Sequence, residues 1–151
     1  MRRPPTKVSH TAMFQRILVP TDLTERATKA LDLALKLSAP AGGRVILLHV
    51  IETVRGLELD EGEPFYQKLE QKAQRIMATA RERLPKTQTE VVQEIVYGDR
   101  AEEIVRFAAV HNIDLIVLAS HRITPSVVGR DWGTISYKVG ILAQCPVLLV
   151  K

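Results

Sequence analysis

Cysteine is nearly absent from this chain, which has one, Cys145, in 151 residues. A single cysteine excludes an internal disulfide framework and is typical of a reducing compartment, so we expect a cytoplasmic protein. No run approaches the roughly 18 apolar residues that a membrane-spanning helix needs. The basic start, Met1 to Pro5, has no apolar segment behind it, unlike a secretory signal. We therefore predict no membrane association.

Aromatic residues are also scarce, at 5% of the chain, and none lies within a basic run. The net charge is +4, but Arg2, Arg3 and Lys7 supply three of these charges within a segment that has no acidic residue. Nucleic-acid binders concentrate cations on a folded face, often with aromatic side chains that stack on bases. We therefore predict no nucleic-acid partner, and we expect residues 1–13 to be a disordered basic tail.

The common catalytic motifs are missing as well. The chain has no G-x-x-x-x-G-K-[ST] loop and no G-x-S-x-G elbow. Ser120 and His121 are adjacent, and neighbouring residues rarely face each other as nucleophile and base. His49, His111 and His121 lack the spacing of metal ligands, and the first two are typical of structural histidines. We predict no catalytic residues, no metal site and no dedicated enzyme activity; slow ATP hydrolysis is the one reaction left open.

What the sequence does contain is a regular alternation of short apolar runs and amphipathic stretches. The apolar runs are typical of strands buried on both faces of a parallel sheet, and the more alternating run is typical of an edge strand. Asp22-x-x-Glu25 and Asp99-x-x-Glu102 resemble helix-capping boxes. Strands are expected over 16–20, 44–50, 90–97 (the edge), 115–119 and 147–150, and helices after Asp22, over 64–84, after Asp99 and over 134–143.

This order of elements predicts an α/β fold, an open five-stranded parallel sheet with helices on both faces. Its strand order is 2-1-3-4-5 or 3-2-1-4-5, and ligands bind such sheets where the chain reverses direction. For 3-2-1-4-5 that point lies between the segments 19–22 and 119–122. Their side chains include a carboxylate, hydroxyls, an imidazole and a guanidinium, which suit a polar, partly anionic ligand.

Each polar residue at this point also has a purely structural interpretation. Asp22 can accept hydrogen bonds from sugar hydroxyls or cap a helix. Arg122 and His121 can hold phosphate or can be solvated loop residues. Gly133 and Thr134 can form an anion site at a helix start, or a turn followed by an N-cap.

Several segments resemble the universal stress protein family. The matching segments are 17–22, 45–50, 98–104, 114–122, 133–135 and 145–150. They span a single predicted domain over residues 14–151. The resemblance implies a Rossmann-like fold with the 3-2-1-4-5 order, a role in stress response and a homodimer that pairs through Val147–Val150.

The resemblance also implies a binding site for ATP with Mg²⁺. The residues implied are Pro20, Thr21, Asp22, Val50, Ala119, Ser120, His121, Arg122, Gly133, Thr134 and Ile135. ATP-binding members carry G-x-x-G, nine residues, then G-S or G-T. Here Gly133-Thr134 is intact, whereas the first two glycines are replaced by Ala119 and Arg122, or by Ser120 and Ile123 in the other alignment.

Two hypotheses therefore stand. The first is a regulator that binds an adenine nucleotide at the switch point of the sheet, which Asp22 and Gly133-Thr134 favour. The second is a dimeric interaction protein that binds no nucleotide, which the altered glycine motif favours.

Overall fold

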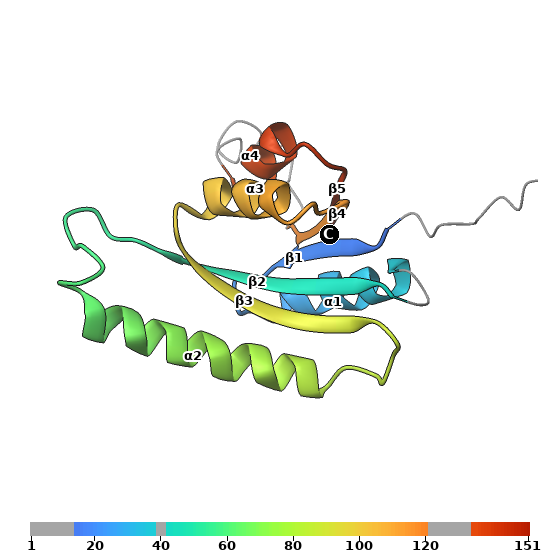
Figure 1. Cartoon of the computed structure of the whole chain (residues 1–151), viewed down its shortest axis with the longest axis horizontal. Helices are drawn as coiled ribbons and strands as arrows, with labels where there is room; N and C mark the ends of the chain where they lie inside the picture. The colour runs from blue at the N-terminus through green and yellow to red at the C-terminus, as the bar shows by residue number, and fades with distance from the viewer. Residues whose placement is uncertain (1–13, 39–41, 121–133) are drawn as a thin grey trace, which may run out of the picture.

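A single parallel sheet organises the computed structural model, which describes residues 14–38, 42–120 and 134–151. Its strand order is β3-β2-β1-β4-β5, and every neighbouring pair is parallel (Figure 1). The order 3-2-1-4-5 is thus confirmed. The elements are β1 (Arg16–Pro20), α1 (Arg26–Leu37), β2 (Arg44–Glu52), α2 (Glu63–Glu82), β3 (Glu90–Gly98), α3 (Arg100–Val110), β4 (Leu115–Ala119), α4 (Ile135–Leu142) and β5 (Val147–Val150).

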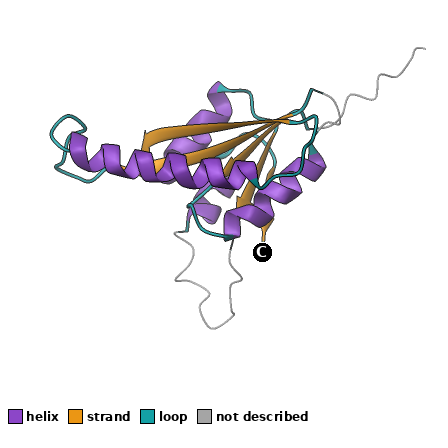
Figure 2. Cartoon of the chain, turned by 90° about the horizontal axis from the view of Figure 1, so that it is seen from below, coloured by secondary structure: helices purple, strands orange, loops and turns teal. Residues whose placement is uncertain are grey.

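Helices cover both faces of the sheet, as predicted, and the alternation of strand residues decides which helices each face receives. Ile17 and Val19 of β1 pack with α1 and α2, whereas Leu18 between them packs with α3 and α4. The same alternation holds in β2 and β4. Figure 2 shows the long helix α2 lying across the sheet on the α1 side. The three central strands are therefore buried on both sides, which explains their continuous apolar sequences.

The sheet has two different edges. β3 forms one edge and is only half-buried, which confirms the prediction from its alternating sequence. β5 forms the other, and its Leu149 side chain is exposed. β2 and β3 are longer than the other strands, and the long helix α2 packs along both of them (Figure 1).

Helix starts agree with the sequence in two cases and differ in one. Asp99 caps α3 by accepting a hydrogen bond from the Glu102 N–H at 3.1 Å, and Thr134 caps α4. The capping box predicted at Asp22 and Glu25 is wrong. α1 begins later, at Arg26, without a side-chain cap, because Asp22 bonds instead to Thr24 in the preceding turn. In the described parts of the chain, no helix has the length and apolar character that crossing a membrane requires.

Asp114 fixes the relative position of the two strands at the switch point. Its Oδ2 and Oδ1 atoms accept hydrogen bonds from the backbone N–H groups of Gln15 and Arg16, at 2.7 and 3.1 Å. Arg16 also donates to the carbonyl of His111 at 3.0 Å. These bonds hold the start of β1 against the start of β4, so the carboxyl ends of the two short strands emerge side by side.

Candidate functional site

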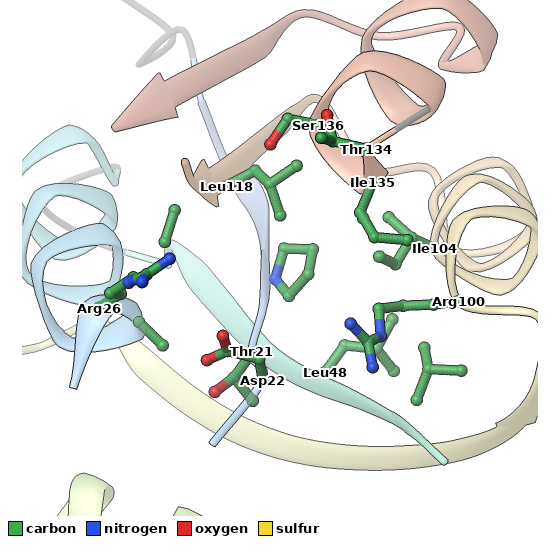
Figure 3. Close-up of a pocket in the computed structure, with 14 residues that line it drawn as sticks. Thr21, Asp22, Arg26, Leu48, Arg100, Ile104, Leu118, Thr134, Ile135 and Ser136 are labelled. Carbon is green, nitrogen blue, oxygen red and sulfur yellow. The ribbon is translucent and has the colours of Figure 1, made fainter. Parts of the chain in front are cut away.

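A pocket of about 310 Å³ lies at the carboxyl ends of β1 and β4, where the chain reverses direction across the sheet (Figure 3). This is the place where open parallel sheets bind ligands. Its lining comes from strands and helices of both faces: Pro20, Thr21, Asp22, Arg26, Ala27, Leu48, Val50, Arg100, Ile104, Leu118, Ala119, Thr134, Ile135 and Ser136.

The structure brings most of the residues expected at the site into this one pocket. Those that line it are Pro20, Thr21, Asp22, Val50, Ala119, Thr134 and Ile135. Ser120 lies just outside, in an adjoining depression. His121, Arg122 and Gly133 lie outside the described residues. Whether the lining residues contact a nucleotide stays a prediction.

The end of β1 is held by hydrogen bonds to β2. The Thr21 N–H donates to the carbonyl of Leu48 at 2.8 Å. His49 Nδ1 lies 2.9 Å from the Thr21 carbonyl oxygen, which can only accept, so Nδ1 carries the proton. His49 is therefore a structural residue, as its place in a strand predicts, and it fixes the backbone that presents Asp22.

Asp22 presents a carboxylate at the mouth of the pocket. Its Oδ1 accepts from the Thr24 N–H at 2.9 Å and from the Thr24 hydroxyl, and Leu23 between them has a φ of 67°. No other described residue donates a hydrogen bond to Oδ2. Burial raises the pKa of Asp22 in part, but the Thr24 hydrogen bonds and nearby Arg26 more than offset this, so its pKa lies below its ordinary value. Asp22 is thus ionised at neutral pH, with one oxygen available to a donor on a ligand.

One wall of the pocket is apolar. Leu48 and Leu118 point from the strands toward Ile104 of α3 and Ile135 of α4 (Figure 3). Val50 lines the same pocket and belongs to the same core cluster. Of these, only Val50 and Ile135 were expected at the site. The period of two along a strand is the signal that could have added Leu48, because it shares a face with Val50. A flat, apolar ring system is the natural occupant of such a wall.

The start of α4 forms the opposite side of the pocket. Thr134 Oγ1 accepts from the Tyr137 N–H at 3.4 Å, and Ile135 and Ser136 follow in the first turn. The unpaired N–H groups and the dipole of a helix start favour anions. The hydroxyls and amides here therefore suit an acidic group such as phosphate.

Two arginines that the sequence did not suggest as site residues line the pocket. Arg26 comes from α1 and Arg100 from α3, on opposite sides (Figure 3). Arg100 pairs with Glu52 at 3.3 Å. Its place depends on the turn before α3, where Gly98 has a φ of +146°. Only contacts across the fold bring these side chains to the site, so spacing along the sequence carries no signal for them.

The described residues offer neither a metal site nor a reactive thiol. Within the described ranges, no group of three or more His, Cys, Asp or Glu side chains could hold a metal ion. His111 stacks on Phe107 with ring centroids 3.9 Å apart, in keeping with its expected structural role. Cys145 is half-buried against the core, and burial raises the pKa of its thiol. The thiol therefore stays protonated and unreactive at neutral pH.

A larger hollow, of about 640 Å³, lies between α1 and α2 on the other face of the sheet. Leu31, Met77 and Leu84 form part of its lining. It is the less suitable ligand site despite its volume, because it lies away from the switch point and away from the α4 start.

The sequence and the fold both match known proteins. Residues 13–151 match the model of the universal stress protein family. Universal stress protein MJ0577 of Methanocaldococcus jannaschii is 31% identical, over 92% of this chain and 96% of that protein, and its structure superposes with a TM-score of 0.75. Universal stress protein YxiE of Bacillus subtilis is 27% identical, over 92% of this chain and all of that protein.

Solved structures at lower identity share the fold. The universal stress protein of Archaeoglobus fulgidus in complex with dAMP is 18% identical, with a TM-score of 0.63, over 92% of this chain and 99% of its own. Other structures of this fold, at 21% and 17% identity, hold cAMP and AMP. The match to the family model extends from before β1 to the last residue of β5 and beyond, and the strand order is the one that the resemblance implied. The chain belongs to the universal stress protein family.

Proposed function

We propose that this protein binds an adenine nucleotide, ATP in the first instance, in the switch-point pocket and acts as a regulator in the response to stress. The observation that carries the proposal is the composition of that one pocket. It combines an apolar wall, an ionised carboxylate, two guanidinium groups and a helix start. A nucleotide needs all of these: a surface for the base, an acceptor for donor groups and positive charge for phosphate.

The residues present divide these tasks among them. Leu48, Val50 and Ile104 offer the base an apolar surface, and Asp22 Oδ2 can accept from a ribose hydroxyl or a base N–H. The start of α4, at Thr134 and Ser136, suits the first phosphate. Among the described residues that line the pocket, Asp22 is the one carboxylate. Mg²⁺ would therefore enter mainly on the phosphates, as it commonly does in nucleotide sites.

The fold relatives support this assignment. Structures that share the fold hold dAMP, cAMP or AMP, so the fold accommodates adenine nucleotides in those proteins. In this chain the same architecture and a chemically suitable pocket occur together.

The described lining suits binding better than catalysis. It contains the hydroxyls of Thr21, Thr134 and Ser136, but no described histidine lines it to serve as their base. Activated nucleophiles need such a partner within hydrogen-bond reach. A regulator that senses occupancy of the site requires no such pair.

Calorimetric titration with ATP and Mg²⁺ tests the proposal. We expect micromolar binding by the wild-type protein, verified by mass spectrometry to carry no nucleotide beforehand. Asp22→Ala should weaken it at least tenfold, because the carboxylate acceptor is lost, whereas Asp32→Ala, which removes an exposed acid from α1 outside the pocket, should leave it unchanged. Absence of binding by the nucleotide-free wild type would refute the proposed function.

The second candidate, a dimeric interaction protein, is favoured by a different observation. Large apolar side chains are exposed on β5 and on the neighbouring helix α4: Tyr137, Ile141, Leu142 and Leu149. An open strand edge beside apolar surface invites pairing with another chain. We propose a homodimer through Val147–Val150, which is compatible with nucleotide binding and would be the main activity if the pocket stays empty.

A further inference from the structure

A basic depression adjoins the switch-point pocket at the carboxyl ends of β4 and β5. It has a volume of about 420 Å³ and shares Arg26 and Ala119 with the pocket. A ligand in the pocket can therefore extend past Arg26 into it. The basic depression is lined by Glu25, Arg26, Lys29, Ala119, Ser120, Val150 and Lys151.

The side-chain charge of the basic depression is positive. Among the described residues that line it, Arg26, Lys29 and Lys151 are basic and Glu25 is acidic. Lys151 Nζ lies 3.4 Å from Ser120 Oγ, so a cation and a hydroxyl are already held together there. This set of groups suits an anion with several oxygens.

Arg26 differs from the other arginine of the pocket in forming no salt bridge with a described residue, although its charge lies near enough to Asp22 to help lower the pKa of that carboxyl group. Arg100 is neutralised by Glu52 at 3.3 Å. Within residues 14–38, 42–120 and 134–151, no hydrogen bond and no direct salt bridge reaches the Arg26 guanidinium. Figure 3 shows its side chain directed into the pocket from the α1 side.

The position of Arg26 at the start of its helix is unfavourable for a cation. It is the first residue of α1, where the positive end of the helix dipole disfavours a cation, and the first turn contains no acidic residue. An anion bound beside Arg26 would remove this unfavourable interaction. The placement is therefore better explained by a ligand than by the stability of α1.

The size of the pocket indicates which part of a ligand reaches the basic depression. At about 310 Å³ the pocket is at the lower end of the range for small-molecule sites, roughly 300–1,000 Å³. A nucleoside with one phosphate suits this volume, and the adjoining basic depression offers space for further phosphates. We propose that Arg26 and Lys29 bind these outer phosphates, so that the site selects nucleoside di- and triphosphates over monophosphates and cyclic nucleotides. This inference rests on the proposed function.

The test is a series of calorimetric titrations of the full chain with AMP, ADP, ATP and inorganic tripolyphosphate. The wild type should bind ATP more tightly than AMP. The double substitution R26Q/K29Q should lower ATP affinity roughly tenfold, because two charge-assisted contacts are lost, and AMP affinity less than twofold. Lys36→Gln, which removes an exposed cation from the last turn of α1, is the matched control and should change neither. R26Q/K29Q should also keep the wild-type melting temperature, because both side chains are exposed.

The outcomes separate this inference from the proposed function. If the wild type binds AMP and ATP but R26Q/K29Q leaves their affinity ratio unchanged, the inference is overturned and the proposed function stands. If the wild type binds neither nucleotide, the proposed function fails. In that case tripolyphosphate binding that needs Arg26 and Lys29 would keep the basic depression as a polyphosphate site, and its absence would overturn the inference too.

Discussion

Asp22 illustrates what single residues contribute to this site. Its type and its place after a strand were enough to predict a polar group at the switch point. The hydrogen bonds that Asp22 makes could not be predicted in the same way. A capping box and a turn closed by Thr24 differ only in where the helix begins, and the local sequence does not fix that point. The turn leaves Oδ2 open to the pocket, whereas a capping role would have directed the carboxylate at the helix.

Tyr97 gives a prediction of pH dependence at this scale. Its hydroxyl donates a hydrogen bond to Glu70 of α2. Burial, this bond and the charge of Glu70 raise the pKa of Tyr97 to about 12. The folded state therefore favours the neutral phenol, and Tyr97 contributes to the free energy of unfolding. This contribution is fully present below the ordinary pKa, about 10, and is lost as the pH rises through about 12.

Absorbance of tyrosinate during an alkaline titration measures this ionisation. The chain has three tyrosines, and we expect one ionisation near pH 12 that Tyr97→Phe removes. Glu70→Gln should shift the same step toward lower pH. A late step that survives in Tyr97→Phe would show that another residue causes it.

At the scale of elements, the sequence carried most of the information. Apolar runs predicted all five strands because the central ones are buried on both faces, and the alternation in 90–97 predicted an edge. The strand order did not follow from these patterns, which left two orders open until the family resemblance was considered. Packing across the sheet decides which strands pair, and the local pattern of apolar residues in one strand does not indicate its neighbours.

The turn between β3 and α3 is the element on which the Arg100 side of the pocket depends. Gly98 has a φ of +146°, and a Cβ there would lie 2.7 Å from Glu103 Cγ. Gly98→Ala should therefore lower the free energy of unfolding by roughly 1–3 kcal/mol, from backbone strain and the clash. It should also weaken ATP binding, because Arg100 and Ile104 follow the turn.

Denaturant unfolding measures this effect, with Gly140→Ala as the control. Gly140 lies in α4 without a positive φ, and a Cβ there has nothing within 4 Å. Alanine in a helix interior is favoured over glycine by about 1 kcal/mol, so this variant should be as stable as the wild type or more so. Equal effects of the two substitutions would contradict the role given to the turn.

At the scale of the whole molecule, the site is a product of the fold. Sequence reasoning found the residues at the ends of β1 and β4, since strand ends can be identified from local patterns. It missed Arg26, Arg100 and Ser136, because their places in the pocket depend on how three helices pack on the sheet. Leu118 was within reach of the sequence, since it immediately precedes Ala119, but only the fold shows that it faces the pocket.

The proposed homodimer gives a prediction at the scale of the whole molecule. Light scattering at micromolar concentration should give the mass of two chains. Leu149→Glu should produce a monomer, because it places a charge on the exposed residue of the edge strand, whereas Val110→Glu, at an exposed position on α3, should not. A monomeric wild type, or a Leu149→Glu protein that remains dimeric, would count against pairing through β5.

The central claim is that a nucleotide occupies the pocket between the ends of β1 and β4. The most direct measurement is NMR chemical-shift mapping of the isotope-labelled protein during titration with AMP, which avoids any contribution from outer phosphates. Binding in the pocket predicts that the largest amide shifts occur at Asp22, Val50 and Ala119. Shifts confined to the hollow between α1 and α2, around Leu31 and Met77, or no shifts at saturating AMP, would contradict the account.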